Sequence, residues 1–340
     1  MKAAVFDRVG SIRIADRDLP DVAPDCVLLR VSSAGICMTD AHILLGHFPV
    51  PPPRVLGHEL CGVVEAIGDR VDRTWLGEAV VVRPARFCGR CWPCRNGRAH
   101  LCASFRCLGN TDDGGFAEYA TVGADQLVKL AGMSPDRAVW TEPLACVLHA
   151  IEVANAPRAG AILIFGAGTL GQLAVRGLRL VQDARVAVAD PNASKIERAI
   201  GAGAETGFVV PREGAADEVG RAVALWAGES LSAVIETSGK PVALERSVAW
   251  STAGTRIVLF GVGEPNATAR LSPAAVLARE IELAAAAGMT NQAFARATLL
   301  LADSRLDTDG LVDAIIGLDR VPEALQVMTR RSTGKVLVHP

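Results

Sequence analysis

A continuous apolar run followed directly by a glycine-rich turn sets the strongest limit on the fold of this chain. Residues 161–165 read Ala-Ile-Leu-Ile-Phe, as expected for a strand buried on both faces of a parallel sheet. The next six residues read G-A-G-T-L-G, and a helical pattern follows over residues 172–180. A G-x-G-x-x-G alone is weak evidence, but a strand before it and a helix after it are the context that dinucleotide binding requires.

A second apolar run, over residues 185–189, ends in Asp190 and completes this pattern. Glycines in such a turn let the backbone approach a pyrophosphate at the helix N-terminus, and the acid binds the adenosine ribose hydroxyls. Further strands expected over residues 233–236, 256–260 and 281–286 predict a doubly wound parallel sheet. The residues expected to bind the dinucleotide are Gly166, Gly168, Thr169, Leu170, Gly171, Asp190 and Lys195.

The first 150 residues predict a different architecture. Short β-rich runs separated by Pro, Gly and Asp favour a small β-barrel, and they cover residues 1–6, 26–33, 62–67 and 79–83. A chain of 340 residues has room for two domains of ordinary size. We expect one domain over residues 1–149 and 291–340, which a C-terminal strand rejoins, and a nucleotide-binding domain over residues 150–290.

Four closely spaced cysteines form the strongest local metal signal. Cys88, Cys91, Cys94 and Cys102 are separated by two, two and seven residues, so their thiols can close a tetrahedron around one ion. Zinc in a structural role prefers such a shell. An iron–sulfur cluster and a pair of disulfides are the alternatives, and the spacing is too tight for two unstrained bridges. The pattern predicts a structural zinc lobe over residues 86–104.

A second set of metal-ligand types lies between Gly35 and Gly62. Cys37, His58 and Glu59 supply a thiol, an imidazole and a carboxylate, all zinc ligands, beside glycines that leave room for a metal. On these residues alone, a buried cysteine and a hydrogen-bonded core histidine explain the pattern equally well. Glu142, in the first turn of a helix expected from residue 140, becomes a metal candidate only if the fold turns it inward.

Composition narrows the classes of partner. The formal net charge of -2, with both signs mixed along the chain, offers no basic stripe for nucleic acid. No apolar run approaches the length of a membrane helix, and the first residues lack a signal-peptide core. We expect a cytoplasmic protein whose nine cysteines are reduced thiols, with small molecules and further copies of itself as partners.

Taken in order, these motifs resemble those of the zinc-dependent medium-chain dehydrogenases, in the alcohol and polyol (sorbitol-like) group, over essentially the whole chain. The resemblance implies a GroES-like catalytic domain interrupted by a Rossmann domain, with the active site in the cleft between them. It depends on the four-cysteine lobe, on the nucleotide-binding turn, and on the family spacing of Gly57, His58, Glu59, Gly62, Gly68 and Val71.

The same resemblance implies roles for individual residues. Cys37 and His58 correspond to ligands of a catalytic zinc, and Thr39 and His42 to a relay that passes the substrate proton to solvent. Glu142 stands where the alcohol dehydrogenases carry a thiolate ligand. This departure agrees with the polyol branch, where Glu59 can act in catalysis as a direct zinc ligand and Glu142 binds zinc directly or through water. Whether Glu59 or Glu142 is the direct ligand in this chain stays open.

Together these features predict a zinc-dependent oxidoreductase, with two zinc ions per chain, that oxidises a secondary alcohol of polyol, cyclitol or sugar-alcohol type to the ketone. NAD is the expected hydride acceptor, because Asp190 would repel the 2′-phosphate of NADP, although Lys195 lies near enough to offset part of that repulsion. The alternatives are a dehydrogenase of simpler alcohols or aldehydes, a metal-free quinone or enoyl reductase, and a non-catalytic nucleotide-binding protein. A homodimer or homotetramer is expected.

Overall fold

The computed structural model describes residues 1–229, 231–303, 306–308, 310–330 and 334–340. The chain forms two compact units. Unit 1 comprises Met1–Pro143, Thr290–Ser304 and Thr308–Pro340, and unit 2 comprises Leu144–Met289 and Arg305–Asp307. In the part of the chain that the structure describes, every helix is too short or too polar to cross a bilayer.

Unit 2 is built on a six-stranded parallel sheet with the strand order β13-β12-β11-β14-β15-β16. All five residues of β11 are buried, which explains its continuous apolar run. The doubly wound parallel sheet predicted from the sequence is therefore confirmed. The strands are β11 (Ala161–Phe165), β12 (Arg185–Asp190), β13 (Thr206–Val209), β14 (Leu231–Glu236), β15 (Arg256–Leu259) and β16 (Glu282–Ala285).

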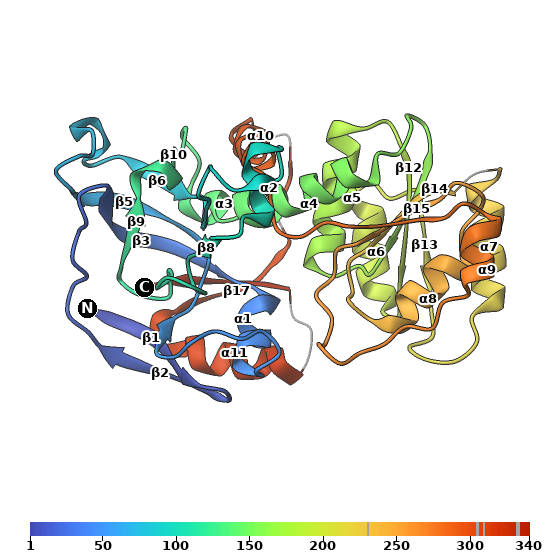
Figure 1. Ribbon diagram of the computed structural model, residues 1–340. Helices are drawn as coiled ribbons and strands as arrows, with labels where there is room; N and C mark the ends of the chain where they lie inside the picture. Colours follow the sequence, from blue (N-terminus) through green and yellow to red (C-terminus); the bar gives the residue numbers. More distant parts are fainter. Residues whose placement is uncertain (230, 304–305, 309, 331–333) are drawn as a thin grey trace. The chain divides into compact units, whose positions relative to one another are not determined.

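Helices cover both faces of this sheet. In Figure 1, α5 and α6 lie on one side of the strands and α7, α8 and α9 on the other. The strand order reverses between β11 and β14, and the carboxyl ends of strands at such a switch point form the ligand crevice of open α/β sheets. The helices are α5 (Thr169–Val181), α6 (Ala193–Gly201), α7 (Asp217–Ala227), α8 (Pro241–Trp250) and α9 (Pro273–Ala278).

Unit 1 consists mainly of β-structure. Its largest sheet has the order β10-β6-β5-β3-β18-β17, and β9 also pairs with β3. A second sheet has the order β2-β1-β4, and β7 pairs with β8. The strands are β1 (Lys2–Arg8), β2 (Ser11–Asp16), β3 (Cys26–Ile36), β4 (Arg54–Val55), β5 (Glu59–Ile67), β6 (Ala79–Val82), β7 (Ala85–Arg86), β8 (Arg106–Cys107), β9 (Tyr119–Gly123), β10 (Leu127–Lys129), β17 (Val312–Gly317) and β18 (Lys335–His339).

Helices are few and mostly short in unit 1. Helix α1 packs against α11, and its buried face carries Ala41, Ile43 and Leu44 (Figure 1). Helix α4 (Thr141–Ala154) begins in unit 1 and continues along the chain into unit 2. The other helices of unit 1 are α1 (Met38–Leu44), α2 (Trp92–Arg95), α3 (Pro135–Ala138), α10 (Asn291–Ala302) and α11 (Val321–Arg330), with 3₁₀ turns at Arg73–Trp75, Ala99–Leu101, Ala124–Gln126 and Leu318–Arg320.

Strand β3 is longer than the sequence indicated. The expected strand ended at residue 33, whereas β3 continues to Ile36. Its last residues have partners on both edges, because Gly35 faces Glu59 of β5 and Leu337 of β18. The extension therefore depends on pairing with distant segments, which the local pattern of serine, alanine and glycine does not reveal.

Each unit has its own hydrophobic core. Phe6, Leu29 and Phe116 lie in the core of unit 1, and Leu163, Val234 and Ile257 lie in that of unit 2.

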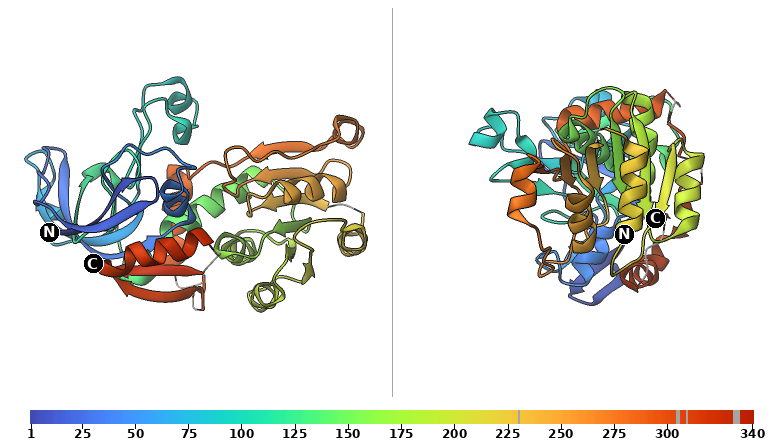
Figure 2. Two further views of the ribbon diagram at one scale, coloured as in Figure 1. Left: turned by 90° about the horizontal axis from the view of Figure 1, so that it is seen from below. Right: turned by 90° about the vertical axis from the view of Figure 1, so that its right-hand side faces the viewer.

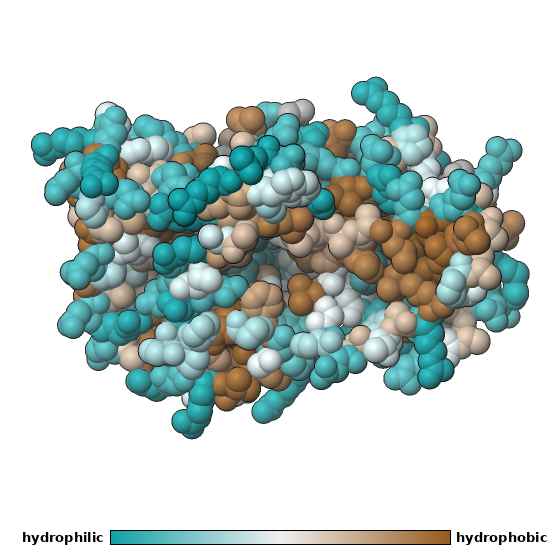
Figure 3. All heavy atoms as spheres, viewed as in Figure 1, coloured by the Kyte–Doolittle hydropathy of each residue, from teal (hydrophilic) through white to brown (hydrophobic). Residues whose placement is uncertain are grey.

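Figure 3 shows hydrophobic side chains gathered on the face of unit 2 that carries α9. Leu277 of α9 and Leu283 of the edge strand β16 are among the exposed large hydrophobic residues.

Candidate active site

Cys37 is held at the point where β3 ends and α1 begins. It is the N-cap residue of α1, with extended backbone angles (φ -107°, ψ 154°). Its amide donates a hydrogen bond of 2.9 Å to Oδ2 of Asp40, and the amide of Asp40 donates one of 3.0 Å back to the carbonyl of Cys37. This reciprocal capping satisfies the first turn of the helix and fixes the position of the thiol.

Asp40 also connects α1 to the segment that carries His58. Its Oδ1 accepts a hydrogen bond of 3.3 Å from the amide of Gly57 and lies 3.6 Å from Nδ1 of His58. The Asp40 carboxylate is fully buried. A carboxylate behind a histidine orients the ring of a metal ligand, so Asp40 is a positioning residue that the sequence analysis did not single out.

The protonation of His58 reflects this contact. Burial alone would lower the pKa of the imidazole, but the charge and hydrogen bond of Asp40, together with Cys37, raise that pKa well above its ordinary value of 6.5. A metal ion can bind the imidazole only by displacing this proton. Metal binding at His58 therefore competes with protons over a wide range of pH.

Glu59 reaches the same place from the first residue of β5. It lies opposite Gly35 in the antiparallel ladder between β3 and β5, and a Cβ atom at Gly35 would collide with the Glu59 carboxylate. Only glycine therefore leaves room for this side chain. The Glu59 side chain is buried.

Cys37, His58 and Glu59 form one group of potential metal ligands. Their ligand atoms all lie within 4.8 Å of one another, and His58 and Glu59 are buried or nearly so. A thiolate, an imidazole and a carboxylate are all zinc donors, and three protein ligands leave one position of a tetrahedron for substrate. The donor set fits a catalytic zinc.

A buried lysine contacts this group from the C-terminal strand. Nζ of Lys335 lies 2.7 Å and 2.5 Å from the two carboxylate oxygens of Glu59, and the lysine is 4% exposed. It also donates a hydrogen bond of 3.2 Å to the carbonyl of Ile36 and lies 5.6 Å from the ring centre of Trp140. Both oxygens of Glu59 are thus paired with an ammonium group, which favours Cys37 and His58 as the primary metal ligands.

The charge of Lys335 follows from its neighbours. Burial lowers the pKa of its ammonium group, but the negative charges of Glu59, Cys37 and Glu142, with the hydrogen bond to Glu59, raise that pKa above the ordinary 10.5. The lysine therefore stays charged at physiological pH. Because its positive charge balances one negative ligand, it reduces the net charge around a bound cation.

Glu142 is turned inward, as the sequence analysis required of a metal candidate. It is 8% exposed, and its charge acts on Lys335 and on Cys107, whose thiol pKa burial raises to about 12. Among the described residues, the groups whose ligand atoms all lie within 4.8 Å of one another are Cys37–His58–Glu59 and the four-cysteine set, and Glu142 belongs to neither. Its carboxylate lies near the site rather than within that ligand group.

The two expected relay residues lie on α1. Oγ1 of Thr39 is 3.6 Å from Sγ of Cys37, which places the hydroxyl beside the metal-ligand group. His42 is three residues further on and shares a face of the helix with Thr39. Nδ1 of His42 lies 3.2 Å from Nδ1 of His47, a residue that the sequence analysis did not single out.

The glycine-rich turn in unit 2 has the geometry that a dinucleotide requires. Gly166 has a φ of +101°, which favours glycine, and a Cβ atom there would lie 2.6 Å from Oγ1 of Thr237. Gly168 is the N-cap of α5, and a Cβ atom at Gly168 would meet open space among the described residues. The turn thus presents bare backbone at a helix N-terminus, which fits a pyrophosphate.

Asp190 and Thr237 brace this turn. The two oxygens of Asp190 accept hydrogen bonds of 2.8 Å from the amides of Ala167 and Asn192. Thr237, directly after β14, donates its hydroxyl to the carbonyls of Phe165 and Gly166 at 3.0 and 3.1 Å. The turns after β11, β12 and β14 are therefore connected at the switch point, and Thr237 is a further residue that the sequence analysis missed.

The remaining expected nucleotide-binding residues also surround the turn. Thr169, Leu170 and Gly171 form the first turn of α5. Lys195 lies in α6, and its carbonyl accepts a hydrogen bond of 2.8 Å from the Gln172 side chain. The structure thus brings every residue of the predicted nucleotide site to one end of the sheet.

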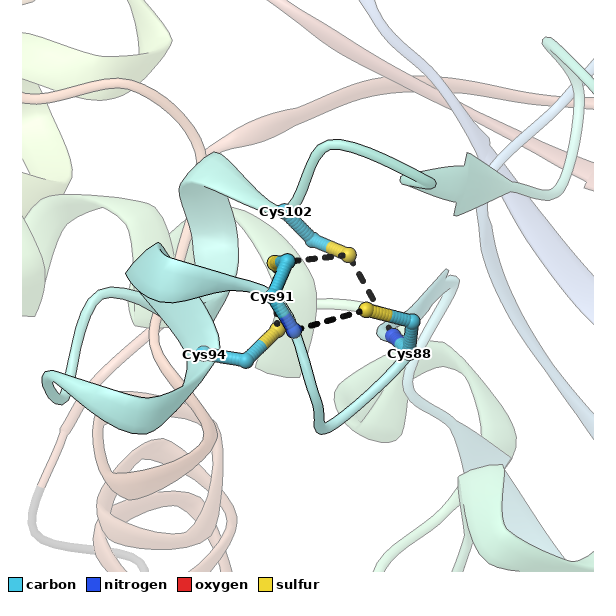
Figure 4. Close-up of side chains that lie close together, drawn as sticks. All are labelled: Cys88, Cys91, Cys94 and Cys102. Atoms are coloured by element: carbon cyan, nitrogen blue, oxygen red, sulfur yellow. Dashed lines mark hydrogen bonds between the residues drawn. The ribbon is translucent and has the colours of Figure 1, made fainter.

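The four cysteines of the lobe converge as their spacing predicted (Figure 4). Sγ of Cys91 lies 3.4 Å from that of Cys94 and 3.8 Å from that of Cys102. Backbone amides of Cys94 and Ala103 donate to Cys91 and lower the pKa of its thiol to about 6. All nine cysteines, which lie within the described ranges, are free thiols, so the structure does not support the disulfide alternative.

The lobe itself is a distinct projection of unit 1. In Figure 2 the segment that carries α2 extends away from the rest of the unit. Its four sulfur atoms point toward one another and lie within 4.8 Å of one another, and Cys102 is buried. Such a site fits a structural zinc, because all four positions of the tetrahedron are protein ligands.

Comparison with known proteins identifies the family of the chain. Residues 23–132 match the model of the alcohol dehydrogenase GroES-like domain, and residues 169–303 match that of the zinc-binding dehydrogenases. The chain is 30% identical to D-altritol 5-dehydrogenase of Agrobacterium fabrum, over 97% of this chain and 96% of that protein. It is 28% identical to D-arabinitol dehydrogenase 1 of Uromyces fabae, over 100% and 97% of the two chains.

A solved structure shows the same architecture. It is that of a protein from Sinorhizobium meliloti described as a zinc-binding dehydrogenase and bound to NADP. The two chains are 30% identical, with a TM-score of 0.90 over 100% of this chain and 99% of that one.

A dinucleotide-binding sheet occurs in many kinds of enzyme. Together with the metal-ligand group of unit 1, it is typical of metal-dependent dehydrogenases. The chain belongs to the zinc-dependent medium-chain dehydrogenase/reductase family, in its alcohol and polyol dehydrogenase group. It is an oxidoreductase that uses zinc and a nicotinamide cofactor to act on alcohols. This membership confirms the resemblance and the GroES-like and Rossmann architecture predicted from the sequence.

Proposed function

We propose that this enzyme oxidises a secondary alcohol on a polyhydroxylated carbon chain to the ketone, with NAD as hydride acceptor. The observation that carries the proposal is the convergence of Cys37, His58 and the buried Glu59 into one ligand group, with Glu142 turned inward beside it. The arabinitol and altritol dehydrogenases among its relatives act on polyols, as their names state. When bound, zinc would supply a Lewis acid for the alcohol oxygen and NAD would accept the hydride.

The residues of the chain divide the remaining work. Cys37 and His58 hold the metal, Asp40 orients His58, and Lys335 holds Glu59 in place by an ion pair. Thr39 accepts the proton of the substrate hydroxyl and passes it to His42, since imidazole is the side chain best suited to exchange protons with water near neutral pH. Nucleotide contacts come from the turn between β11 and α5, with Asp190 and Lys195 on the ribose side.

The proposed substrate class can be tested with a matched pair of alcohols. Glu142 places a carboxylate where the alcohol dehydrogenases have a thiolate. A carboxylate accepts more hydrogen bonds than a thiolate, so it can bind hydroxyl groups on the carbons next to the reacting one. A site that binds a substrate hydroxyl rejects an analogue without it, because its buried polar groups lose their partner. We expect kcat/KM for a vicinal secondary diol to exceed that for the matching mono-alcohol at least about 10-fold.

The control for this comparison is the Glu142→Gln variant. It keeps the size of the side chain and removes its charge, so the preference for the diol should decrease while the cysteine lobe keeps its zinc. A clear preference of the wild-type enzyme for the mono-alcohol would contradict the polyol assignment and would show that these carboxylates serve the metal alone.

A second expected result concerns the cofactor. Asp190 already accepts two amide hydrogen bonds, but each carboxylate oxygen can accept another, so ribose hydroxyls can still bind. We expect kcat/KM to be higher with NAD than with NADP, and Asp190→Ala to reduce the value for NAD by roughly 10-fold or more, as for hydrogen bonds to a charged group. Asp183→Ala, two residues before the opposite end of β12, should leave both values unchanged. Equal or better efficiency with NADP, as the NADP-bound relative allows, would reject the NAD preference.

We also propose a cytoplasmic homodimer or homotetramer. The exposed Leu277 and Leu283 lie on α9 and on the edge strand β16, and an unpaired strand edge with apolar neighbours favours association with a second copy. Light scattering at micromolar concentration measures the state directly.

A further inference from the structure

The last turn of α1 brings two histidine rings into direct contact. Nδ1 of His42 lies 3.2 Å from Nδ1 of His47, the ring centres are 5.4 Å apart, and both side chains are half-buried. The distance is that of a hydrogen bond between the two imidazoles. His47 is thus the next titratable group along the direction in which His42 would release a proton.

The backbone holds this contact in place. The amide of His47 donates a hydrogen bond of 2.8 Å to the carbonyl of His42, and the amide of Phe48 donates one of 3.3 Å to the same oxygen. Gly46 has a φ of +76°, and a Cβ atom there would lie 3.1 Å from the Val9 side chain. The chain therefore reverses tightly after α1, and the reversal fixes His47 against His42 rather than leaving it to side-chain freedom.

Two imidazoles that face each other through Nδ1 must differ in their protonation. One Nδ1 carries the hydrogen and donates, and the other Nδ1 accepts and carries its own hydrogen on Nε2. If His42 is the donor, a proton arriving at its Nε2 allows its Nδ1–H to pass to Nδ1 of His47. His47 then releases the hydrogen on its Nε2 to water. The first step exchanges an O–H bond of the donor for the N–H bond at Nε2 of His42, the second exchanges one N–H bond for another, and the last exchanges the N–H bond at Nε2 of His47 for an O–H bond of water. One passage leaves both tautomers reversed, and rotation of the two rings or exchange with water restores them before the next turnover.

We propose that His47 is the outer member of the proton relay and passes the proton from His42 to solvent. The proposal rests on the proposed function, in which Thr39 and His42 carry the hydroxyl proton. For each alcohol oxidised, a hydride with its two electrons goes to NAD and one proton leaves through Thr39, His42 and His47. His47 acts through His42 and touches no reacting atom, so it is a positioning and proton-accepting residue.

Proton release in a single turnover tests this role. The wild-type enzyme and His47→Gln are mixed with NAD and a secondary alcohol that the wild type oxidises, and a pH-indicator dye is followed together with NADH absorbance. We expect His47→Gln to slow proton release about 10-fold, with KM unchanged and the rate restored by added imidazole, since water replaces an outer relay member only in part. The control His339→Gln, which removes an exposed histidine paired with Asp136, should behave as wild type.

A double variant separates a relay from a structural effect. If His47 acts through His42, combining His42→Gln with His47→Gln should slow proton release no more than His42→Gln alone. Losses that multiply in the double variant, or an unchanged release rate in His47→Gln, would overturn the proposal.

Nitrogen NMR of the imidazoles gives a readout that does not depend on turnover. In the labelled holoenzyme without substrate, we expect one ring of the pair as the Nδ1–H tautomer, and His47→Gln should shift the signals of His42. Two Nε2–H tautomers would show that the rings are not hydrogen-bonded and would overturn the proposal. A wild-type enzyme that oxidises no alcohol would instead count against the proposed function, and the NMR result would still decide whether the pair exists.

Discussion

Replacement of Cys37 by serine is expected to abolish alcohol oxidation while leaving a folded chain that binds zinc only in its four-cysteine lobe. A serine hydroxyl binds zinc much more weakly than a cysteine thiolate does, so the variant should lose the catalytic zinc. The zinc acts as a Lewis acid that stabilises the transition state by several kcal/mol, and its loss should lower the rate roughly 10³-fold. The capping of α1 should survive, because it uses the backbone amide of residue 37 and the Asp40 carboxylate. Elemental analysis and NADH formation measure the two effects.

Cys94→Ser is the matched control for this variant. It removes the same atom from the closed four-cysteine set, where a bound zinc would stabilise the lobe itself. We expect loss of zinc from the lobe and a lower thermal midpoint, whereas Cys37→Ser should retain a midpoint near that of the wild type. Finding a single zinc ion in fully active wild-type enzyme would contradict the two-site assignment.

The cysteine lobe and the nucleotide turn could be predicted from the sequence because each is local. The four thiols lie within fifteen consecutive residues, and the turn follows directly on a strand. In both cases the spacing of residue types alone fixes which side chains can meet. The structure accordingly places all of these residues as the sequence indicated.

The position of Asp40 could have been predicted in part from the sequence. Asp40 stands three residues after the N-cap Cys37, the position from which an acid caps the first turn of a helix. The spacing therefore could have indicated that Asp40 fixes Cys37. That it also reaches Gly57 and His58 could not be predicted, because this contact joins segments 17 residues apart, whose approach depends on the tertiary fold.

The local sequence around Lys335 gives no indication that this residue lies at the site. It reaches the site because β18 pairs with β3 in a register that places Val336 opposite Ile36, which sets Lys335 beside Cys37. The same strand β3 brings Gly35 opposite Glu59 through its other edge. Two strand registers between segments far apart in the chain thus create the ion pair, and hydrophobic pattern alone does not determine either of them.

Lys335→Met is expected to destabilise the enzyme more than any surface charge substitution. It leaves the Glu59 carboxylate buried without its partner, and breaking one side of a buried pair costs about 3–5 kcal/mol of unfolding free energy. Because the pKa of Lys335 is raised on folding, the contribution of the lysine charge is fully present below pH 10.5 and is lost as the pH rises through the folded value. Urea denaturation of the zinc-loaded enzyme at neutral pH measures the loss.

The chain contains a closely matched exposed pair for comparison. Nζ of Lys129 lies 2.9 Å from Glu78 and 5.8 Å from the ring centre of Trp75, whereas Lys335 pairs with Glu59 beside Trp140. Lys129→Met should cost less than about 1 kcal/mol, because water screens an exposed pair. Adding Glu59→Gln to Lys335→Met should recover part of the lost stability by removing the unpaired charge. Equal losses in the Lys335 and Lys129 variants would show that burial does not govern the strength of this pair, and that Glu59 finds another cation when the lysine is gone.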